Sequence, residues 1–136
     1  MNEAERFNAG QKDHLPDHLG MIWEEISHGA AKGRFTVAKH HMAPNGYMHA
    51  GSVVTLLDTA CGYACVVSRP EGSIGFTTIE LKTNFLGTGR IGDEITCEAR
   101  LLHGGRTTQV WDAEARNAGK LIATFRCTQM LLYPKA

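Results

Sequence analysis

Residues 40–67 read HHMAPNGYMHAGSVVTLLDTACGYACVV, and this stretch decides the fold. A turn signal at 44–46 and a His-Ala-Gly step at 49–51 precede a long apolar run. From Ser52 onwards, apolar residues recur at helical spacing on nearly every side, which predicts a helix buried all round rather than one on the surface. One carboxylate, Asp58, lies in the middle of this run, and its presence there needs an explanation.

The predicted helix has two adjacent faces and a defined end. Turn residues at 69–72 end it. Gly62 interrupts it, and because glycine costs a helix about 1 kcal/mol relative to alanine, a close approach by another backbone is expected there. The first face carries Val53, Leu57, Ala60 and Ala64, and the second carries Val54, Asp58, Cys61 and Cys65.

The segment before the helix predicts a helical arm and a hairpin. Residues 1–14 predict a short helix on the outside of the domain, which ends before Leu15-Pro16. Residues 18–26 and 34–40 predict two strands joined by a turn at 29–33.

After the helix, four strand-like runs follow one another. Turn signals at 103–105 and 117–119 separate the last three runs. Consecutive long strands predict an antiparallel meander, and a strongly curved sheet is an economical way to enclose one apolar helix. We therefore expect an α+β fold and a single domain over residues 1–136. The four runs are 75–87, 93–104, 106–117 and 120–133.

Composition bounds the class of protein. The chain has 136 residues, of which 43% are hydrophobic and 21% charged, a balance typical of a soluble globular domain. Its 14 basic and 14 acidic residues cancel, which leaves no global electrostatic footprint for nucleic acid. No apolar run is expected to reach the roughly 18–20 residues that cross a bilayer, and the polar N-terminus lacks the apolar core of a signal peptide. We expect a cytoplasmic protein without nucleic-acid or membrane partners, whose four cysteines are buried free thiols.

At this point the sequence resembles a known family. A curved sheet around one helix is the hotdog fold. The segment Asn-Gly-Tyr-Met-His-Ala-Gly at 45–51, followed by Leu-Leu-Asp-Thr-Ala at 56–60, resembles the signature of hotdog acyl-CoA thioesterases. The chain is most similar to the phenylacetate-degradation (PaaI) and 4-hydroxybenzoyl-CoA group, and residues 105–123 resemble that group's closing hairpin. The resemblance implies hydrolysis of an aryl- or medium-chain acyl-CoA to the free acid and CoA, with no cofactor beyond the CoA of the substrate.

Thioester hydrolysis develops an oxyanion, which backbone N–H groups at a helix N-terminus can stabilise. The N–H of Ala50 is the first candidate donor, and that of Gly51 is the second. The family commonly has His-Gly-Gly where this chain has His-Ala-Gly, but alanine presents the same N–H and is unstrained at the helical angles expected there. Asn45 either directs its amide at the same oxygen or at a water, or serves as a turn residue beside Gly46.

Asp58 is the candidate base or nucleophile. Apolar surroundings raise the pKa of a carboxyl group, which makes it a better base near neutral pH, so it can activate a water or attack the thioester itself. The structural alternative is a buried Asp whose carboxylate forms hydrogen bonds across a subunit interface. His49 either assists the site and the leaving thiolate or fixes the loop at the start of the helix. Thr78 aligns with a family Ser/Thr that positions the hydrolytic water, with the neighbouring Thr77 as the other alignment and an exposed strand threonine as the structural alternative.

Other residues invite a CoA or metal interpretation. Arg90, Arg106 and Arg116 could meet the phosphates of CoA, and Arg106 follows two glycines whose backbone N–H groups can also bind phosphate. Each of them could equally be a solvated surface charge. A metal site is not expected, because the adjacent His40 and His41 would point to opposite faces of an extended segment.

The resemblance also implies an assembly. In this family the cleft forms between two subunits with their helices side by side. Asp58 of one chain would then face Asn45, His49 and Ala50 of the other in a homodimer, which can pair further into a homotetramer. Two other functions stay open: a hotdog hydratase or dehydratase acting on acyl-CoA or acyl carrier protein, and a non-catalytic acyl-CoA-binding module.

Overall fold

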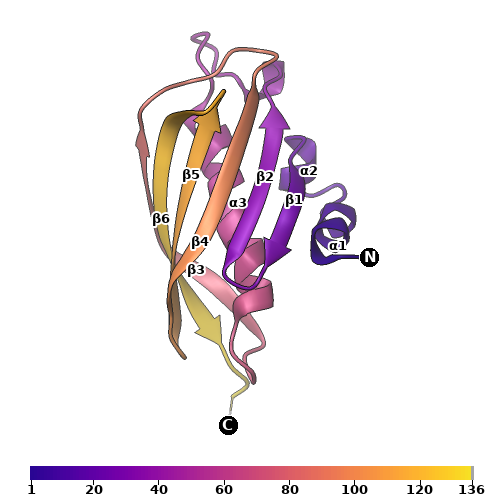
Figure 1. Cartoon of the computed structure of the whole chain (residues 1–136), viewed down its shortest axis with the longest axis vertical. Helices are drawn as coiled ribbons and strands as arrows, with labels where there is room; N and C mark the ends of the chain where they lie inside the picture. Colours follow the sequence, from indigo (N-terminus) through magenta and orange to yellow (C-terminus); the bar gives the residue numbers. More distant parts are fainter. Residues whose placement is uncertain (136) are drawn as a thin grey trace.

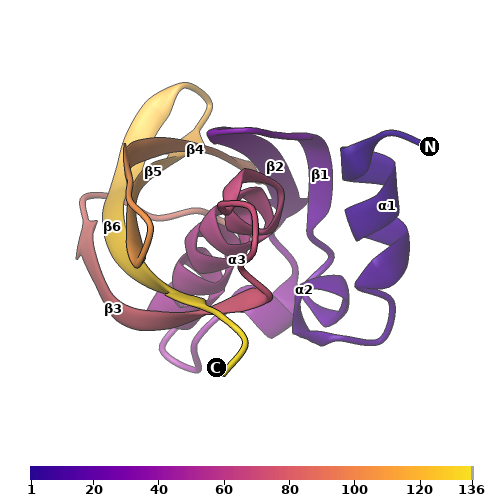
Figure 2. The same ribbon diagram turned by 90° about the horizontal axis from the view of Figure 1, so that it is seen from below.

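One long helix, α3 (Ala50–Ser68), lies at the centre of the molecule, and a six-stranded antiparallel sheet curves around it (Figures 1 and 2). The computed structural model describes residues 1–135. The predicted α+β architecture, one apolar helix enclosed by a curved sheet, is confirmed. The other elements are α1 (Glu3–Gly10), α2 (Leu15–His18), β1 (Ile22–Ser27), β2 (Ala30–Thr36), a 3-10 helix (Lys39–His41), β3 (Gly75–Phe85), β4 (Glu94–Gly104), β5 (Thr108–Asn117) and β6 (Lys120–Leu132).

The strand order across the sheet is β1-β2-β4-β5-β6-β3. Strands β4, β5 and β6 form the predicted meander, but the prediction that β3 begins it is wrong, because β3 pairs with β6 and β4 pairs with β2. Residues 86–93 make this order possible, since they cross from β3 to the chain just beyond β2. There the N–H of Gly92 donates to the carbonyl of Val37 at 2.8 Å, and the N–H of Val37 donates to the carbonyl of Asp93 at 2.8 Å.

The first hairpin turns earlier than predicted. Its turn lies at His28–Gly29 rather than at 29–33, and Ala30 already pairs with Ser27. Gly29 has a φ of +81°, a left-handed conformation that glycine adopts without strain, and this allows the tight turn.

Gly33 belongs to β2 and marks close packing rather than a turn. A Cβ at this position would lie 2.3 Å from the ring of Trp23, so only glycine fits under the indole. The strand ends at Thr36, and Lys39–His41 form a 3-10 helix where the sequence predicted that the strand would continue to His40.

The two edges of the sheet differ. The edge of β1 is covered by α1, which lies on the outside as predicted (Figure 2): the Asn8 side chain donates to the carbonyl of Trp23 at 2.9 Å and accepts from its N–H at 2.8 Å. In the described chain no strand pairs with the other edge of β3. Ile79, Leu81 and Phe85 on this strand are 52%, 42% and 47% exposed. An uncovered apolar edge strand is the kind of surface that pairs with another chain.

Helix α3 is long and apolar enough to cross a membrane by length and composition alone, which corrects the expectation that no segment reaches that length. The central helix of a sheet-wrapped protein passes the same test, and the predicted inner face of α3 is buried against the sheet. All four cysteines are buried free thiols, as predicted. The buried residues of that helix face are Val53, Leu57, Ala60 and Ala64.

Candidate active site

The N-terminus of α3 presents one backbone N–H without an acceptor. Ala50 is the first residue of the helix and His49 is its N-cap. The N–H of Gly51 donates to Nδ1 of His49 at 2.7 Å, whereas the N–H of Ala50 has no acceptor within residues 1–135. Of the two predicted oxyanion donors, Ala50 is therefore available and Gly51 is occupied. Ala50 does not adopt a positive φ, so the alanine in the His-Ala-Gly step is unstrained.

His49 fixes the start of the helix through its ring. Because Nδ1 accepts a hydrogen bond, the ring proton is on Nε2 in the neutral tautomer. A Cβ on residue 51 would lie 2.9 Å from that Nδ1, so Gly51 provides the room that the imidazole needs. The loop-fixing role that the sequence left open for His49 is therefore present.

His41 holds the loop that leads into α3, a role that sequence reasoning missed. Its carbonyl accepts from the N–H of His49 at 2.8 Å and from the hydroxyl of Ser52 at 3.0 Å. Its ring accepts from the N–H of Ala38 at 2.9 Å and lies 2.6 Å from the carbonyl of Leu19. Burial lowers the pKa of His41, which favours the neutral ring that this pair of bonds requires.

The prediction that His40 and His41 point to opposite faces is wrong. Both belong to the 3-10 helix, and their ring centroids are 4.2 Å apart. His41 also stacks on Phe35, with centroids 4.3 Å apart, so it belongs to the core. Within residues 1–135, no group of His, Cys, Asp or Glu side chains is arranged to hold a metal ion.

Asn45 is an exposed turn residue in the single chain. Its Oδ1 accepts from the N–H of Tyr47 at 3.1 Å, which is the turn role that the sequence offered as one of two readings. The amide nitrogen of Asn45 makes no hydrogen bond within the described chain, so the single chain shows no second role for this side chain.

Asp58 is half-buried, and its Oδ1 is a buried oxygen without a hydrogen-bond partner in residues 1–135. Burial raises the pKa of this carboxyl group, and the neighbouring Thr78 hydroxyl acts in the opposite direction. The other titratable group facing it on the helix is the thiol of Cys61. The adjacent Cys127 thiol and burial raise the pKa of Cys61, so the Cys61 thiol stays protonated. A buried carboxylate oxygen without a partner is costly, which makes Asp58 the clearest functional candidate in the chain.

Thr78 lies beside Asp58 on the inner face of β3, whereas Thr77 is exposed. The Thr78 hydroxyl donates to Oε1 of Gln129 at 2.7 Å. Gln129 is fully buried on β6 and was not identified from the sequence, because its partner is 51 positions away along the chain. Its position in the strand-like run after 120 was the only signal available.

Gly62 lies one helical turn beyond Asp58, and its neighbour differs from the prediction. A Cβ there would lie 3.2 Å from Cζ of Phe76, so an aromatic side chain, not another backbone, approaches the helix. Phe76 and Thr78 lie two positions apart on β3 and therefore face the same side of the sheet.

Asp58 and Ala50 cannot contact one thioester carbonyl within a single chain. They are eight positions apart on the same helix, which places them about 12 Å apart along its axis at ~1.5 Å per residue. An oxyanion donor and a base must each lie about 3 Å from the reacting group.

The three arginines predicted to meet CoA do not form one cluster. Arg106 and Arg116 lie beyond or near opposite ends of β5, roughly 30 Å apart at ~3.3 Å per residue. Arg116 is engaged with Glu114 at 2.9 Å, and Arg90 lies at the same end, in the loop closed by its own N–H bond to Asp93 at 2.9 Å. The guanidinium of Arg106 makes no ion pair within the described chain.

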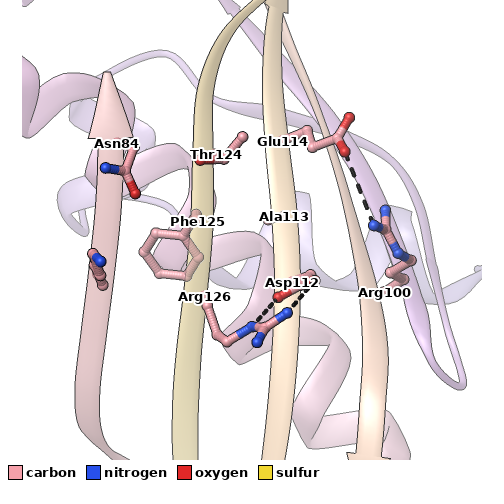
Figure 3. Close-up of a pocket in the computed structure, with 9 residues that line it drawn as sticks. Asn84, Arg100, Asp112, Ala113, Glu114, Thr124, Phe125 and Arg126 are labelled. Carbon is pink, nitrogen blue, oxygen red and sulfur yellow. Dashed lines mark hydrogen bonds and ion pairs between the residues drawn. The ribbon is translucent and has the colours of Figure 1, made fainter. Parts of the chain in front are cut away.

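A depression of about 310 Å³ on the outer face of the sheet does not belong to this site (Figure 3). Its charged side chains are mostly paired: Arg126 binds both oxygens of Asp112, at 2.6 and 3.0 Å, and Arg100 lies 3.9 Å from Glu114. None of the predicted site residues lines it. Surface ion pairs of this kind contribute little to folding stability. We assign this depression no function.

Comparison with known proteins identifies relatives of the chain. The family model described as "Thioesterase superfamily" matches residues 45–123. The acyl-coenzyme A thioesterase PaaI of Escherichia coli is 31% identical over 117 residues, which cover 85% of this chain and 81% of that protein. The 1,4-dihydroxy-2-naphthoyl-CoA hydrolase of Listeria monocytogenes is 29% identical over 115 residues, which cover 84% of this chain and 92% of that protein.

Solved structures show the same fold. A thioesterase of Pseudomonas aeruginosa, solved as a mutant, superposes with a TM-score of 0.89 at 28% identity, covering 97% of this chain and 95% of that one. The PaaI protein from the phenylacetic acid degradation operon of E. coli superposes with a TM-score of 0.84 at 26% identity. The match covers 96% of this chain and 94% of that one.

Proposed function

The chain belongs to the thioesterase superfamily and is a thioester hydrolase, and from that premise we propose that it hydrolyses an aryl- or medium-chain acyl-CoA to the free acid and CoA. The names of two relatives support a CoA ester as substrate, since one is an acyl-coenzyme A thioesterase and the other hydrolyses an aromatic CoA ester. The same premise disfavours the two alternative functions, a hydratase or dehydratase and a non-catalytic acyl-CoA-binding module.

One observation carries the proposed mechanism: the buried Oδ1 of Asp58 has no partner in residues 1–135. In the proposed reaction Asp58 either takes a proton from a water, whose oxygen then attacks the thioester carbon, or attacks that carbon itself. The C–S bond breaks in the collapse of the tetrahedral intermediate, and the thiolate of CoA leaves and takes up a proton. If Asp58 is the nucleophile, the acyl group stays on it as a mixed anhydride, which a water then hydrolyses to the free acid and the Asp58 carboxylate. The reaction needs only this chain's residues and water. The raised pKa of Asp58 makes it a stronger base than an exposed carboxylate.

The N–H of Ala50 is the proposed oxyanion donor. It has no acceptor in residues 1–135, it lies at the positive end of the α3 dipole, and its neighbour Gly51 is already bonded to His49. Because Ala50 is about 12 Å from Asp58 along the helix axis, these two groups act on one carbonyl only if they come from different chains.

We propose a homodimer in which the free edges of β3 from two chains meet and the α3 helices lie side by side in opposite directions. The uncovered edge of β3, with exposed Ile79, Leu81 and Phe85, supports this arrangement. Antiparallel helices related by a two-fold axis would bring Asp58 of one chain toward Ala50 of the other. Such dimers can pair further into a tetramer.

Arg106 is the proposed contact for the phosphates of CoA. It is exposed, its guanidinium forms no ion pair with another described residue, and it follows Gly104-Gly105 at the end of β4. Arg116 is a weaker candidate because it is bonded to Glu114 and to the carbonyl of Gly119 at 3.1 Å. The bond from Gln109 to the carbonyl of Ser68 places the start of β5 at the C-terminal end of α3, so a dimer with antiparallel helices would bring Arg106 of one chain nearer to the α3 N-terminus of the other.

The experiment that tests this function compares thiol release from phenylacetyl-CoA, benzoyl-CoA and hexanoyl-CoA by the wild type and by Asp58→Asn. We expect release by the wild type and a loss of about 10²–10⁴-fold in the variant. Because folding raises the pKa of Asp58, its charged form costs stability at neutral pH, so the variant should have an equal or higher Tm.

Asp112→Asn is the matched control. It makes the same chemical change on the outer face of the sheet, where Asp112 is paired with Arg126, and it should leave thiol release unchanged. Full activity in Asp58→Asn, or no thiol release by the wild type from any CoA ester, would refute the proposal.

A further inference from the structure

A buried amide lies directly behind the candidate site. Thr78 pairs in register with Gln129 on β6, and Gln129 pairs with Gln109 on β5, so the three side chains form a row on the inner face of the sheet. Both glutamines are buried, at 0% and 1% exposure. The row is polar and adjoins the apolar core, and each buried amide needs a reason to be there.

The two glutamines have different partners. Gln109 accepts from the indole N–H of Trp111 at 2.9 Å and donates to the carbonyl of Ser68 at 3.0 Å, which ties β5 to the end of α3. Gln129 instead accepts from the Thr78 hydroxyl at 2.7 Å, while its amide nitrogen faces Sγ of Cys127 at 3.6 Å. A sulfur is a weak acceptor, so Thr78 is the main partner of Gln129.

The Thr78 hydroxyl has one proton and two acceptors within reach. One is the amide oxygen of Gln129, which receives the proton, and the other is the carboxyl group of Asp58. The hydroxyl lowers the pKa of Asp58 only when its single proton turns to the carboxylate. While that proton points at Gln129, 2.7 Å away, the hydroxyl presents only lone pairs toward Asp58. A water between them can then donate one hydrogen to Thr78 and the other to Asp58, which leaves its own lone pair directed outward.

We propose that Gln129 is a positioning residue that takes the Thr78 proton, so that Thr78 accepts a hydrogen bond from the water that Asp58 activates. This inference rests on the proposed function and assigns a residue that the site motifs do not contain. Without Gln129, the Thr78 proton turns to the Asp58 carboxylate. The Thr78 proton then occupies the lone pair of Asp58 that should receive the proton of the water. The Thr78 oxygen also no longer serves as the acceptor that orients that water.

The first experiment is a double-mutant cycle on kcat for a CoA ester. Gln129→Met keeps the length of the side chain and removes its amide, and kcat should fall about tenfold, the rate equivalent of one lost hydrogen bond. In the Thr78→Val background the same change should have no further effect, because no hydroxyl is left to orient. Gln109→Met is the matched control: it removes an equally buried amide, so it lowers Tm but leaves kcat within twofold.

The second experiment needs no substrate. The pKa of Asp58 is read in the free protein from the carboxyl ¹³C shift as a function of pH. It should fall in Gln129→Met, because a hydrogen bond from Thr78 to the carboxylate favours the charged form. It should stay unchanged in Gln109→Met and should not fall when Thr78→Val is added. The other titratable group facing this carboxyl is the thiol of Cys61, and all these variants retain it together with the Cys127 thiol beside it.

An unchanged pKa of Asp58 in Gln129→Met would overturn the inference, and so would an additive loss of kcat in the double variant or an equal loss in Gln109→Met. If Gln129→Met does not fold, Gln129→Asn gives the same test, because its shorter amide does not reach the Thr78 hydroxyl. Absence of thiol release by the wild type would refute the proposed function, whereas the titration would still decide how Thr78 is oriented.

Discussion

Asp58 carries most of the functional account, and it could be identified from the sequence. A single carboxylate among apolar residues at helical spacing is conspicuous in any chain, and the structure leaves one of its oxygens buried and without a partner in residues 1–135. What the sequence could not show is which backbone donor is free. Both Ala50 and Gly51 were candidates, and only the position of the His49 ring decides between them.

Gln129 illustrates the same limit at the residue scale. Its amide reaches Thr78 through a strand pairing that joins positions 51 apart in the chain. Local patterns of hydrophobicity identify strands but do not specify which residues of distant strands stand opposite each other. Side-chain hydrogen bonds across the sheet therefore lie beyond sequence periodicity.

Ala50→Pro tests the oxyanion donor by removing the backbone N–H hydrogen of residue 50. Proline lacks the N–H, yet it is favoured at the first position of a helix, and the preceding His49 has φ −66° and ψ 132°, which suit a residue before proline. We expect Tm close to that of the wild type and a fall in kcat of about 10²–10³-fold. Ala50→Ser, which keeps the N–H, is the control and should retain activity. Wild-type turnover by Ala50→Pro would show that this N–H is not the donor.

At the scale of elements, the start of α3 depends on an unusual cap. An imidazole nitrogen takes the place of the Ser, Thr, Asp or Asn oxygen that helices usually use, and Gly51 is the residue that makes room for it. His49→Ala should lower the free energy of unfolding by about 1 kcal/mol. His49→Asn, with a side chain that caps well, should recover most of this loss in chemical denaturation. Equal stability of the wild type and His49→Ala would rule out the capping role.

The elements themselves were largely predictable, and their order in the sheet was not. Alternation and turn residues identified six strands and the helix, because each signal is local. The placement of β3 beside β6 depends on residues 86–93 crossing to the chain beyond β2, which is a tertiary event. The shift of the first turn also has a tertiary cause. Gly33 suggested a turn in the sequence, but a glycine is needed there because the Trp23 ring leaves no room for a Cβ.

At the scale of the whole molecule, the two sheet edges suggest how the protein assembles. Helix α1 covers the edge of β1, but β3 has no strand on its free side in the described chain. The helix supports the same conclusion, because its free N–H and its unpartnered carboxylate are about 12 Å apart along one axis. Each chain therefore contributes half of two sites in the proposed dimer.

The most direct test of this account mixes two variants that are each inactive alone, Asp58→Asn and Ala50→Pro. After subunit exchange, about half of the dimers contain one chain of each kind, and each of these has one site with both Asp58 and the Ala50 N–H intact. The account predicts that thiol release recovers to about a quarter of the wild-type rate. No recovery, with mixed dimers shown to be present by mass spectrometry, would contradict a site shared between two chains.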